Sequence, residues 1–176
     1  MAYTANIVPT MGSYTYPSGT ASDDGNAGSG YEGWHAFDHA LGTTYWYHLA
    51  TSGYVQYQFI ATHVITRYTI TSRAVANDLR TPKAWTFKGS NNGSSWDTLD
   101  TQTNITWDTV GTLTKTFDIA NSTAYAYYRL AVSESNDANY FCVGELEMME
   151  TAGGGAAVPV RSIGSGIGSG IASGIA

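Results

Sequence analysis

Two histidines and an aspartate lie close together in the first quarter of the chain and are candidates for metal binding. His35 and His39 are four residues apart, with Asp38 between them. This spacing brings two side chains to the same side of a helix, where such a pair can bind zinc. The surrounding residues are typical of a loop-rich region, so we interpret both histidines as packing or surface residues.

Other patterns that support catalysis are missing from the sequence. Glu145 and Glu147 would share one face of a strand, but no second pair of buried carboxylates is evident for acid–base chemistry. There is no nucleophile elbow of the Gly-x-Ser-x-Gly type, no phosphate-binding loop and no Cys/His set with zinc spacing. Cys142 is the only cysteine, which excludes an intrachain disulfide. We therefore predict that the protein is not an enzyme.

The elements that must position any site are predicted to be strands, and the clearest signal is residues 82–96. Trp85 and Phe87 alternate with polar residues, the period of two expected when one face of a sheet is buried. Asn92-Gly93 predicts a primed hairpin turn, because both residues tolerate a positive φ. After the turn, Trp96 is expected to re-enter the apolar layer.

The opening of the chain, residues 6–11 followed by 17–21, is similar to that of discoidin-like modules in bacteriophage virion proteins. Three further segments, in order, resemble the discoidin or coagulation factor 5/8 C-type family. They are residues 36–46, similar to Ala-Phe-Asp-Gly-Asn-x-x-Thr-x-Tyr-Trp, the 82–96 hairpin, and 127–132 followed by 144–147. The resemblance runs from about Asn6 to Met149. It implies an all-β jelly-roll sandwich of the galactose-binding-like type over residues 1–150.

Short strands with turn signals between them agree with this fold class. The expected strands are 53–60, 63–73, 82–91, 95–103, 113–119, 124–133 and 141–150. In the last of these, Cys142 would share a side with Leu146 and Met148, which indicates a small buried hydrophobe rather than a nucleophile. We find no convincing amphipathic helix in this part of the chain.

The resemblance also implies a structural calcium ion, because sugar-binding relatives hold one beneath the loop that corresponds to residues 38–44. The matching ligands are Asp38, Thr43 and Glu145, with backbone carbonyls near Ala40. Oxygen ligands of this kind suit calcium. The chain departs from the family pattern at His39 and Ala40, where Gly and Asn or Asp are expected, so one side-chain ligand is missing.

Sugar binding in this family uses loops at one end of the sandwich. An aromatic ring covers the apolar side of a pyranose, while Arg, His and Asn bond its hydroxyl groups. The residues in the corresponding loops are Trp34, His35, Asn77, Arg80, Asn139 and Tyr140. The resemblance therefore implies that these six side chains contact host-surface glycans, although each also has a purely structural alternative.

Composition excludes several partners. The formal net charge is −6, and only 12% of residues are charged, which argues against nucleic acid. No run of Lys or Arg offers a membrane-binding patch. The first residues lack the basic and apolar segments of a secretory signal, so we expect synthesis in the host cytoplasm.

Residues 151–176 differ sharply in composition from the rest and form a predicted tail. Isoleucine recurs every fourth residue among Gly and Ser, at Ile163, Ile167, Ile171 and Ile175. This regularity is not typical of a flexible linker and favours docking or oligomerisation, as either strand or helix. The combined hypothesis is a virion-surface accessory protein, such as a decoration protein or fibre, that displays a carbohydrate-binding domain. The alternatives are a purely structural cement protein and a free-standing lectin.

Overall fold

The computed structural model describes residues 1–75, 79–107 and 113–153, and strands dominate them. Asn77 and the four tail isoleucines lie outside the described residues. The elements are β1 (Thr20–Asp23), η1 (Gly33–Phe37), β2 (Trp46–His48), β3 (Gly53–His63), β4 (Arg67–Thr71), β5 (Pro82–Ser90), β6 (Asp97–Gln102), β7 (Thr114–Asp118), β8 (Tyr125–Ser135), β9 (Phe141–Val143) and β10 (Glu145–Met149). Among the described residues, no helix is long and apolar enough to span a membrane.

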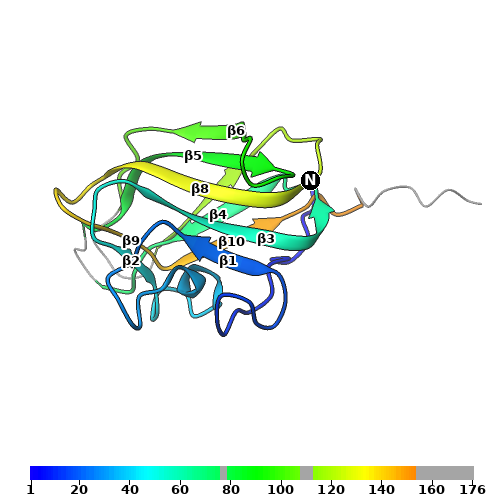
Figure 1. The fold of residues 1–176 in the computed structure, drawn as a ribbon. Coiled ribbons are helices and arrows are strands. Elements are labelled where there is room, and N and C mark those ends of the chain that lie inside the picture. The colour runs from blue at the N-terminus through cyan, green and yellow to red at the C-terminus, as the bar shows by residue number, and fades with distance from the viewer. Residues whose placement is uncertain (76–78, 108–112, 154–176) are drawn as a thin grey trace, which may run out of the picture.

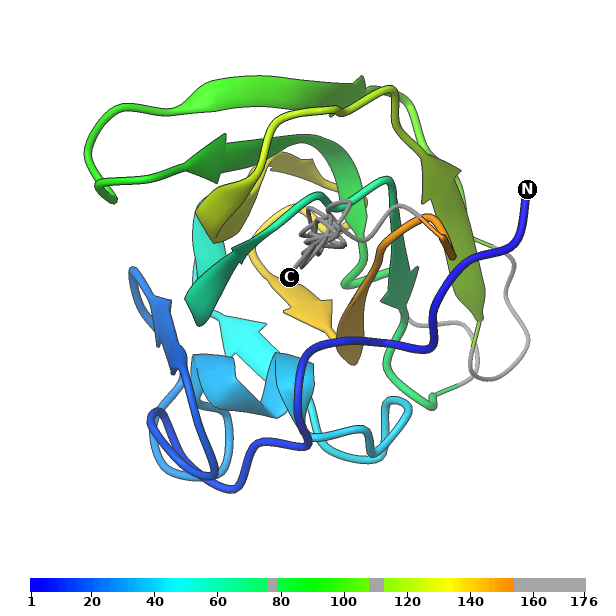
Figure 2. The same ribbon diagram turned by 90° about the vertical axis from the view of Figure 1, so that its right-hand side faces the viewer.

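The strands form a sandwich of antiparallel sheets. A five-stranded sheet has the order β1-β3-β8-β5-β6, and a three-stranded sheet has the order β10-β4-β7. Strands β2 and β9 pair separately at one end of the sandwich (Figure 1). Figure 2 shows the two layers enclosing a common interior. The all-β class and the β-sandwich predicted from the sequence are confirmed.

The centre of the core is a stack of aromatic rings that joins the two sheets. Phe87 on β5 stacks on Tyr68 of β4, with ring centroids 4.3 Å apart, and on Tyr128 of β8 at 5.7 Å. The Tyr68 hydroxyl donates to Asp100 Oδ2 at 2.7 Å and accepts from Trp85 Nε1 at 2.8 Å. Burial raises the pKa of Tyr128 to about 12. The core is therefore aromatic, and its buried hydroxyls have partners.

The turn between β5 and β6 differs from the prediction. It spans residues 91–96, and of the Asn92-Gly93 pair only Gly93 has a positive φ, 69°. The Asn92 side chain instead accepts hydrogen bonds from the amides of Ser94 and Ser95, at 2.9 and 2.8 Å. The register pairs Gly89 with Asp97, which puts Trp96 on the outer side of the sheet. The predictions of a primed turn and of an inward-facing Trp96 are therefore wrong.

The strand expected over 141–150 is broken at Gly144 into β9 and β10, which belong to different sheets. Gly144 donates its amide to Thr71 O at 2.8 Å. A Cβ here would lie 2.6 Å from Ser72 O and 2.8 Å from Gly42 Cα, so only glycine fits between these backbones. Cys142 is fully buried on β9, as predicted.

The two ends of the described domain meet. Tyr3 and Thr151 form an isolated bridge, and the Ala152 amide donates to Ala2 O at 2.9 Å. In Figure 1 the N-terminus, marked N, lies at the opposite end of the sandwich from β2 and β9. The first and the last described residues therefore lie side by side.

We expect Gly144→Ala to lower the free energy of unfolding by roughly 1–3 kcal/mol, because the added methyl group must displace the backbone at Ser72 or Gly42. Urea denaturation measures this change. Gly12→Ala is the matched control, since its Cβ would meet only the Tyr16 ring at 3.4 Å, and should change stability by less than about 0.5 kcal/mol. Equal effects in the two variants would contradict the proposed crowding.

Candidate functional site

Four tyrosine rings gather where β2 and β9 pair, and we call them the tyrosine cluster. Tyr45 and Tyr47 flank Trp46, which is fully buried and donates its indole N–H to Gly25 O at 2.9 Å. Because side chains alternate along an extended chain, burying Trp46 turns its two neighbours outward. The Tyr31 ring lies 5.5 Å from both, and the Tyr140 ring lies 5.7 Å from that of Tyr47. All four are partly exposed.

Two arginines flank the tyrosine cluster. The Arg80 guanidinium carbon lies 5.6 Å from the centre of the Tyr47 ring. Arg73 lies 5.2 Å from the Tyr45 ring centre, and its Nη1 donates to the Tyr45 hydroxyl at 3.3 Å. Burial raises the pKa of the Tyr47 phenol, so its hydroxyl stays protonated at neutral pH. The cluster thus combines flat apolar rings with hydroxyl groups and cations, a combination that suits a polyhydroxylated ligand.

The strand positions explain why these residues meet. Tyr47 pairs with Cys142, so the loop that precedes β9 and carries Tyr140 lies beside β2. The Cys142 amide donates to Arg80 O at 2.7 Å, which ties the segment after residue 78 to the same strand. The Tyr47 amide donates to Tyr31 O at 3.2 Å. Backbone hydrogen bonds therefore hold three separate segments around one tyrosine.

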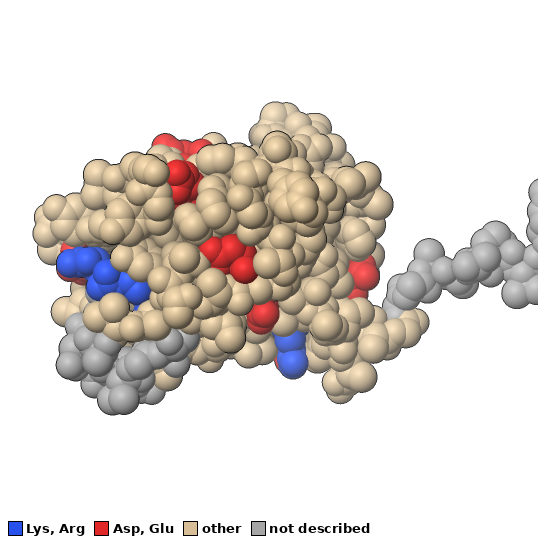
Figure 3. All heavy atoms as spheres, turned by 90° about the horizontal axis from the view of Figure 1, so that it is seen from below, with Lys and Arg blue, Asp and Glu red and all other residues tan. Residues whose placement is uncertain are grey.

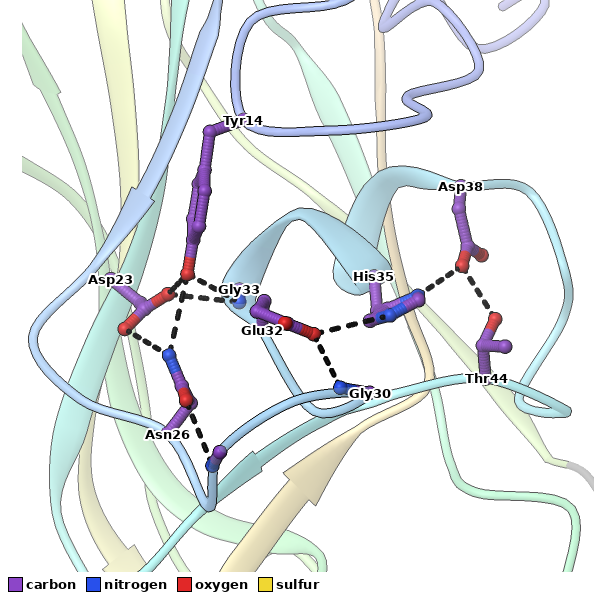
Figure 4. A network of polar contacts seen from close by, with 10 residues as sticks. Tyr14, Asp23, Asn26, Gly30, Glu32, Gly33, His35, Asp38 and Thr44 are labelled. Atoms are coloured by element: carbon purple, nitrogen blue, oxygen red, sulfur yellow. Dashed lines mark hydrogen bonds and ion pairs between the residues drawn. The ribbon is translucent and has the colours of Figure 1, made fainter.

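A polar network holds the segment that carries Tyr31 (Figure 4). Asp23 Oδ2 accepts from the Tyr14 hydroxyl at 2.5 Å and from the Gly33 amide at 2.8 Å, at the start of η1. Burial, with help from Asp23, raises the pKa of Tyr14 to about 12. The Gly30 amide donates to Glu32 Oε2 at 2.8 Å. These contacts fix the backbone on both sides of Tyr31.

Only some of the six predicted ligand-binding residues meet at the tyrosine cluster. Arg80 and Tyr140 both contact Tyr47. Asn139 is exposed in the same loop as Tyr140, and its backbone N–H donates to Asp137 Oδ1 at 2.8 Å. Asn77 lies outside the described residues.

Trp34 and His35 lie on η1 and are engaged elsewhere. Their rings are in contact, with centroids 3.7 Å apart and planes tilted by 30°, and Trp34 packs on the core. His35 is 8% exposed, with Nδ1 2.8 Å from Asp38 Oδ2 and Nε2 3.5 Å from Glu32 Oε2 (Figure 4). These contacts hold the His35 ring between two carboxylates. They also explain the spacing of His35 and Asp38 without a metal.

Sequence reasoning missed Tyr31, Tyr45 and Tyr47, which form most of the cluster. The alternation Tyr45-Trp46-Tyr47 could have identified two of them, because a strand that buries its tryptophan must expose both tyrosines. Tyr31 has no comparable signal, since a contact between separate loops sets its position.

Figure 3, which views the molecule from below, shows a surface with few charged side chains.

The three predicted calcium ligands lie in and beneath the 38–44 loop. Asp38 accepts hydrogen bonds from the Ala40 amide at 3.0 Å and the Thr44 hydroxyl at 2.5 Å. The Thr43 hydroxyl donates to Ala40 O at 2.8 Å, rather than to a carboxylate. Within the described parts of the chain, no three His, Cys, Asp or Glu side chains form a metal-ligand group.

Glu145 is the feature of this region that fits a cation. It is fully buried, and neither carboxylate oxygen has a hydrogen-bond partner within the described residues. Burial raises the pKa of Glu145 to about 9, and the charges of Asp38 and Glu147 add to this increase. Nearby amides of His39 and Ala40 offset only part of it. An unpaired buried carboxylate is costly, and a bound cation would remove the cost.

Comparisons with known proteins establish the fold. No family model matches the chain, and no curated protein matches it. Chitosan-binding module 1 of a Paenibacillus sp. IK-5 chitosanase/glucanase is similar, with a TM-score of 0.63 and 17% identity over 82% of this chain and 98% of that chain. The family 32 carbohydrate-binding module of Clostridium perfringens NanJ, in complex with galactose, gives 0.62 and 16% over 75% and 93%. An F5/8 type C domain from Bacteroides fragilis gives 0.64 and 14% over 76% and 91%.

These modules share one architecture, and the protein has it too. Its fold is the galactose-binding-like β-sandwich of the family 32 and F5/8 type C domains. The jelly-roll class expected from the sequence is thereby confirmed.

Proposed function

We propose that the protein is a non-enzymatic glycan-binding module whose ligand lies on the tyrosine cluster. The observation that carries this proposal is the grouping of four partly exposed tyrosine rings beside Arg80 at one end of the sandwich. A pyranose presents an apolar face to such rings, and its hydroxyl groups pair with phenol and guanidinium groups. The similar modules from Paenibacillus and C. perfringens, described as chitosan-binding and galactose-bound, support the same chemistry.

Tyr47→Ala is expected to weaken binding of a neutral sugar by at least about tenfold, because Tyr47 contacts the other three rings and Arg80. A glycan array of neutral oligosaccharides identifies the ligand, and isothermal titration calorimetry then measures its affinity. Tyr16→Ala is the control, since Tyr16 is 70% exposed on another loop.

Two results would refute the glycan proposal. One is an array without a saturable neutral ligand at millimolar concentration. The other is a ligand that the Tyr47→Ala protein binds as tightly as the unchanged protein does.

We further propose that calcium stabilises the 38–44 loop by binding to Glu145, together with Asp38 and the Ala40 carbonyl. Support comes from the two buried oxygens of Glu145 without partners and from the hard-oxygen character of this set. The ion would neutralise the carboxylates and cross-link the loop to β10. This role is structural, and no chemical step depends on it.

Saturating calcium should raise the melting temperature of the full chain. At 100 times the dissociation constant, the gain is about 2.7 kcal/mol, or roughly 5–10 °C for a domain of this size. Glu145→Gln should remove most of the increase. Glu147→Gln, which changes a partly exposed side chain hydrogen-bonded to Thr69, should retain it. Differential scanning calorimetry against EDTA measures the shift. The site assignment fails if 10 mM calcium has no effect or if both variants respond equally.

We place this module on a virion surface, where residues 151–176 dock it to other virion proteins or to copies of itself. Support comes from the resemblance to modules in bacteriophage virion proteins and from the four-residue period of isoleucine. Many copies would convert weak glycan contacts into strong attachment to a host surface. The chain ends of the domain lie opposite the tyrosine cluster, which suits outward display.

Multi-angle light scattering should find an oligomer for the full chain and a monomer for a chain that ends at Gly153. Every described strand lies before that residue, so the shorter chain retains both sheets. If both chains are monomers, the tail does not mediate self-association, and docking would require a different protein as partner. Two oligomers of equal size would show that the tail plays no part in assembly.

A further inference from the structure

The outer face of the five-stranded sheet carries an arginine held between two aromatic rings. The guanidinium carbon of Arg129, in the middle of β8, lies 3.8 Å from the centre of the Tyr54 ring and 4.0 Å from that of Trp96. Its Nε and Nη2 both donate to Gln56 Oε1, at 2.9 and 2.6 Å. The rings cover both flat sides of the guanidinium, and Gln56 occupies one edge. The cation is therefore fixed in position and orientation.

One edge of this guanidinium remains available. Arginine has five N–H donors, and within the described residues the hydrogen bonds of Arg129 all go to Gln56. The remaining donors, on Nη1 and Nη2, lie in the plane between the two rings. A pair of parallel N–H groups of this kind matches the two oxygens of a carboxylate. The open edge of Arg129 can therefore donate two parallel hydrogen bonds to one carboxylate.

The local charge favours the same ligand. Lys88 lies directly across from Arg129 in the register of β5 and β8, so two of the eight Lys and Arg residues are neighbours. In the part of the chain that the structure describes, neither forms an ion pair with a carboxylate. Asp24 acts on Arg129 by its charge, but its Oδ1 accepts from the Tyr54 amide at 2.8 Å and lies 3.3 Å from His48 Nε2. Two adjacent cations repel each other until an anion binds.

The residues around these cations suit a sugar ring. Trp96 and Tyr127 are partly exposed, with ring centroids 6.4 Å apart. The register places Gln58 beside Tyr127, and Gln56 beside Arg129, on the same face. Aromatic rings can cover a pyranose, and amides can bond its hydroxyl groups. Figure 1 shows β8 as the middle strand of this sheet, whereas the tyrosine cluster gathers where β2 pairs with β9.

We propose that Arg129, Lys88 and Trp96 form a second binding site, for a glycan that carries a carboxylate, such as a uronic acid. The carboxylate pairs with the open edge of Arg129 and with Lys88, while the ring packs on Trp96. This site is independent of the tyrosine cluster and of the neutral glycan proposed for it. A chain with both sites would bind an acidic and a neutral sugar at the same time.

The test is a titration of the full ¹⁵N-labelled chain with sodium trigalacturonate, followed by NMR. The Trp96 indole N–H, assigned with Trp96→Phe, and the Arg129 Nε–H should shift saturably. Arg129→Lys should weaken the binding at least about tenfold, because lysine keeps the charge but lacks the pair of parallel N–H donors. Lys88→Gln should weaken it about threefold, the effect of losing one exposed charge contact. Tyr47→Ala should leave it unchanged.

Controls separate this site from weaker explanations. Neutral xylotriose that shifts the Trp96 resonance equally would overturn the acidic specificity. Sodium sulfate at equal ionic strength that reproduces the shifts would show a simple anion site and overturn the sugar assignment. If Arg129→Lys does not fold, Lys88→Gln decides, because within the described residues the Lys88 side chain makes no hydrogen bond that its loss could disturb. Unchanged affinity in that variant would then refute the proposal.

Discussion

The stack of Phe87 between Tyr68 and Tyr128 is the contact on which the sandwich depends. Each ring comes from a different strand, and the stack crosses from one sheet to the other. Tyrosine can occupy this interior only because its hydroxyls have partners, since a buried hydroxyl without one costs several kcal/mol, on the order of 2–7. Asp100 and the backbone at His63 meet this need. Polar bonds therefore tie β5 and β6 to β4, and β8 to the end of β3, in addition to the packing of the rings.

The break at Gly144 connects this core to the proposed sites. Because the chain changes sheets there, β9 can pair with β2 and support the tyrosine cluster, while β10 continues the three-stranded sheet. The same residue lets the 38–44 loop approach the backbone, which encloses Glu145 beneath it. One close contact between backbones thus positions both the tyrosine cluster and the buried carboxylate of Glu145. Local alternation of apolar and polar residues contains no information about such a contact.

The parts of the structure that follow from local pattern could be predicted, and the parts set by long-range contact could not. Trp85 and Phe87 alternate with polar residues and are buried as expected, whereas Trp96 lies outside because the turn before it is longer than Asn92-Gly93 suggests. Arg80 and Tyr140 both lie against Tyr47, and their role in ligand binding stays a prediction. The partners of His35 were not foreseen, because its contacts with Glu32 and Asp38 depend on the 3-10 turn of η1.

The meeting of the chain near Ala2 and Ala152 has a consequence for the modularity of this fold. A backbone hydrogen bond joins the start and the end of the described domain, so its two ends are as close in space as those of a surface loop. Such a unit can be inserted into a loop of another protein, or its ends can be joined and reopened elsewhere, without separating paired strands. The adjacent ends therefore make the sandwich a unit whose strand pairing does not depend on its position in a longer polypeptide.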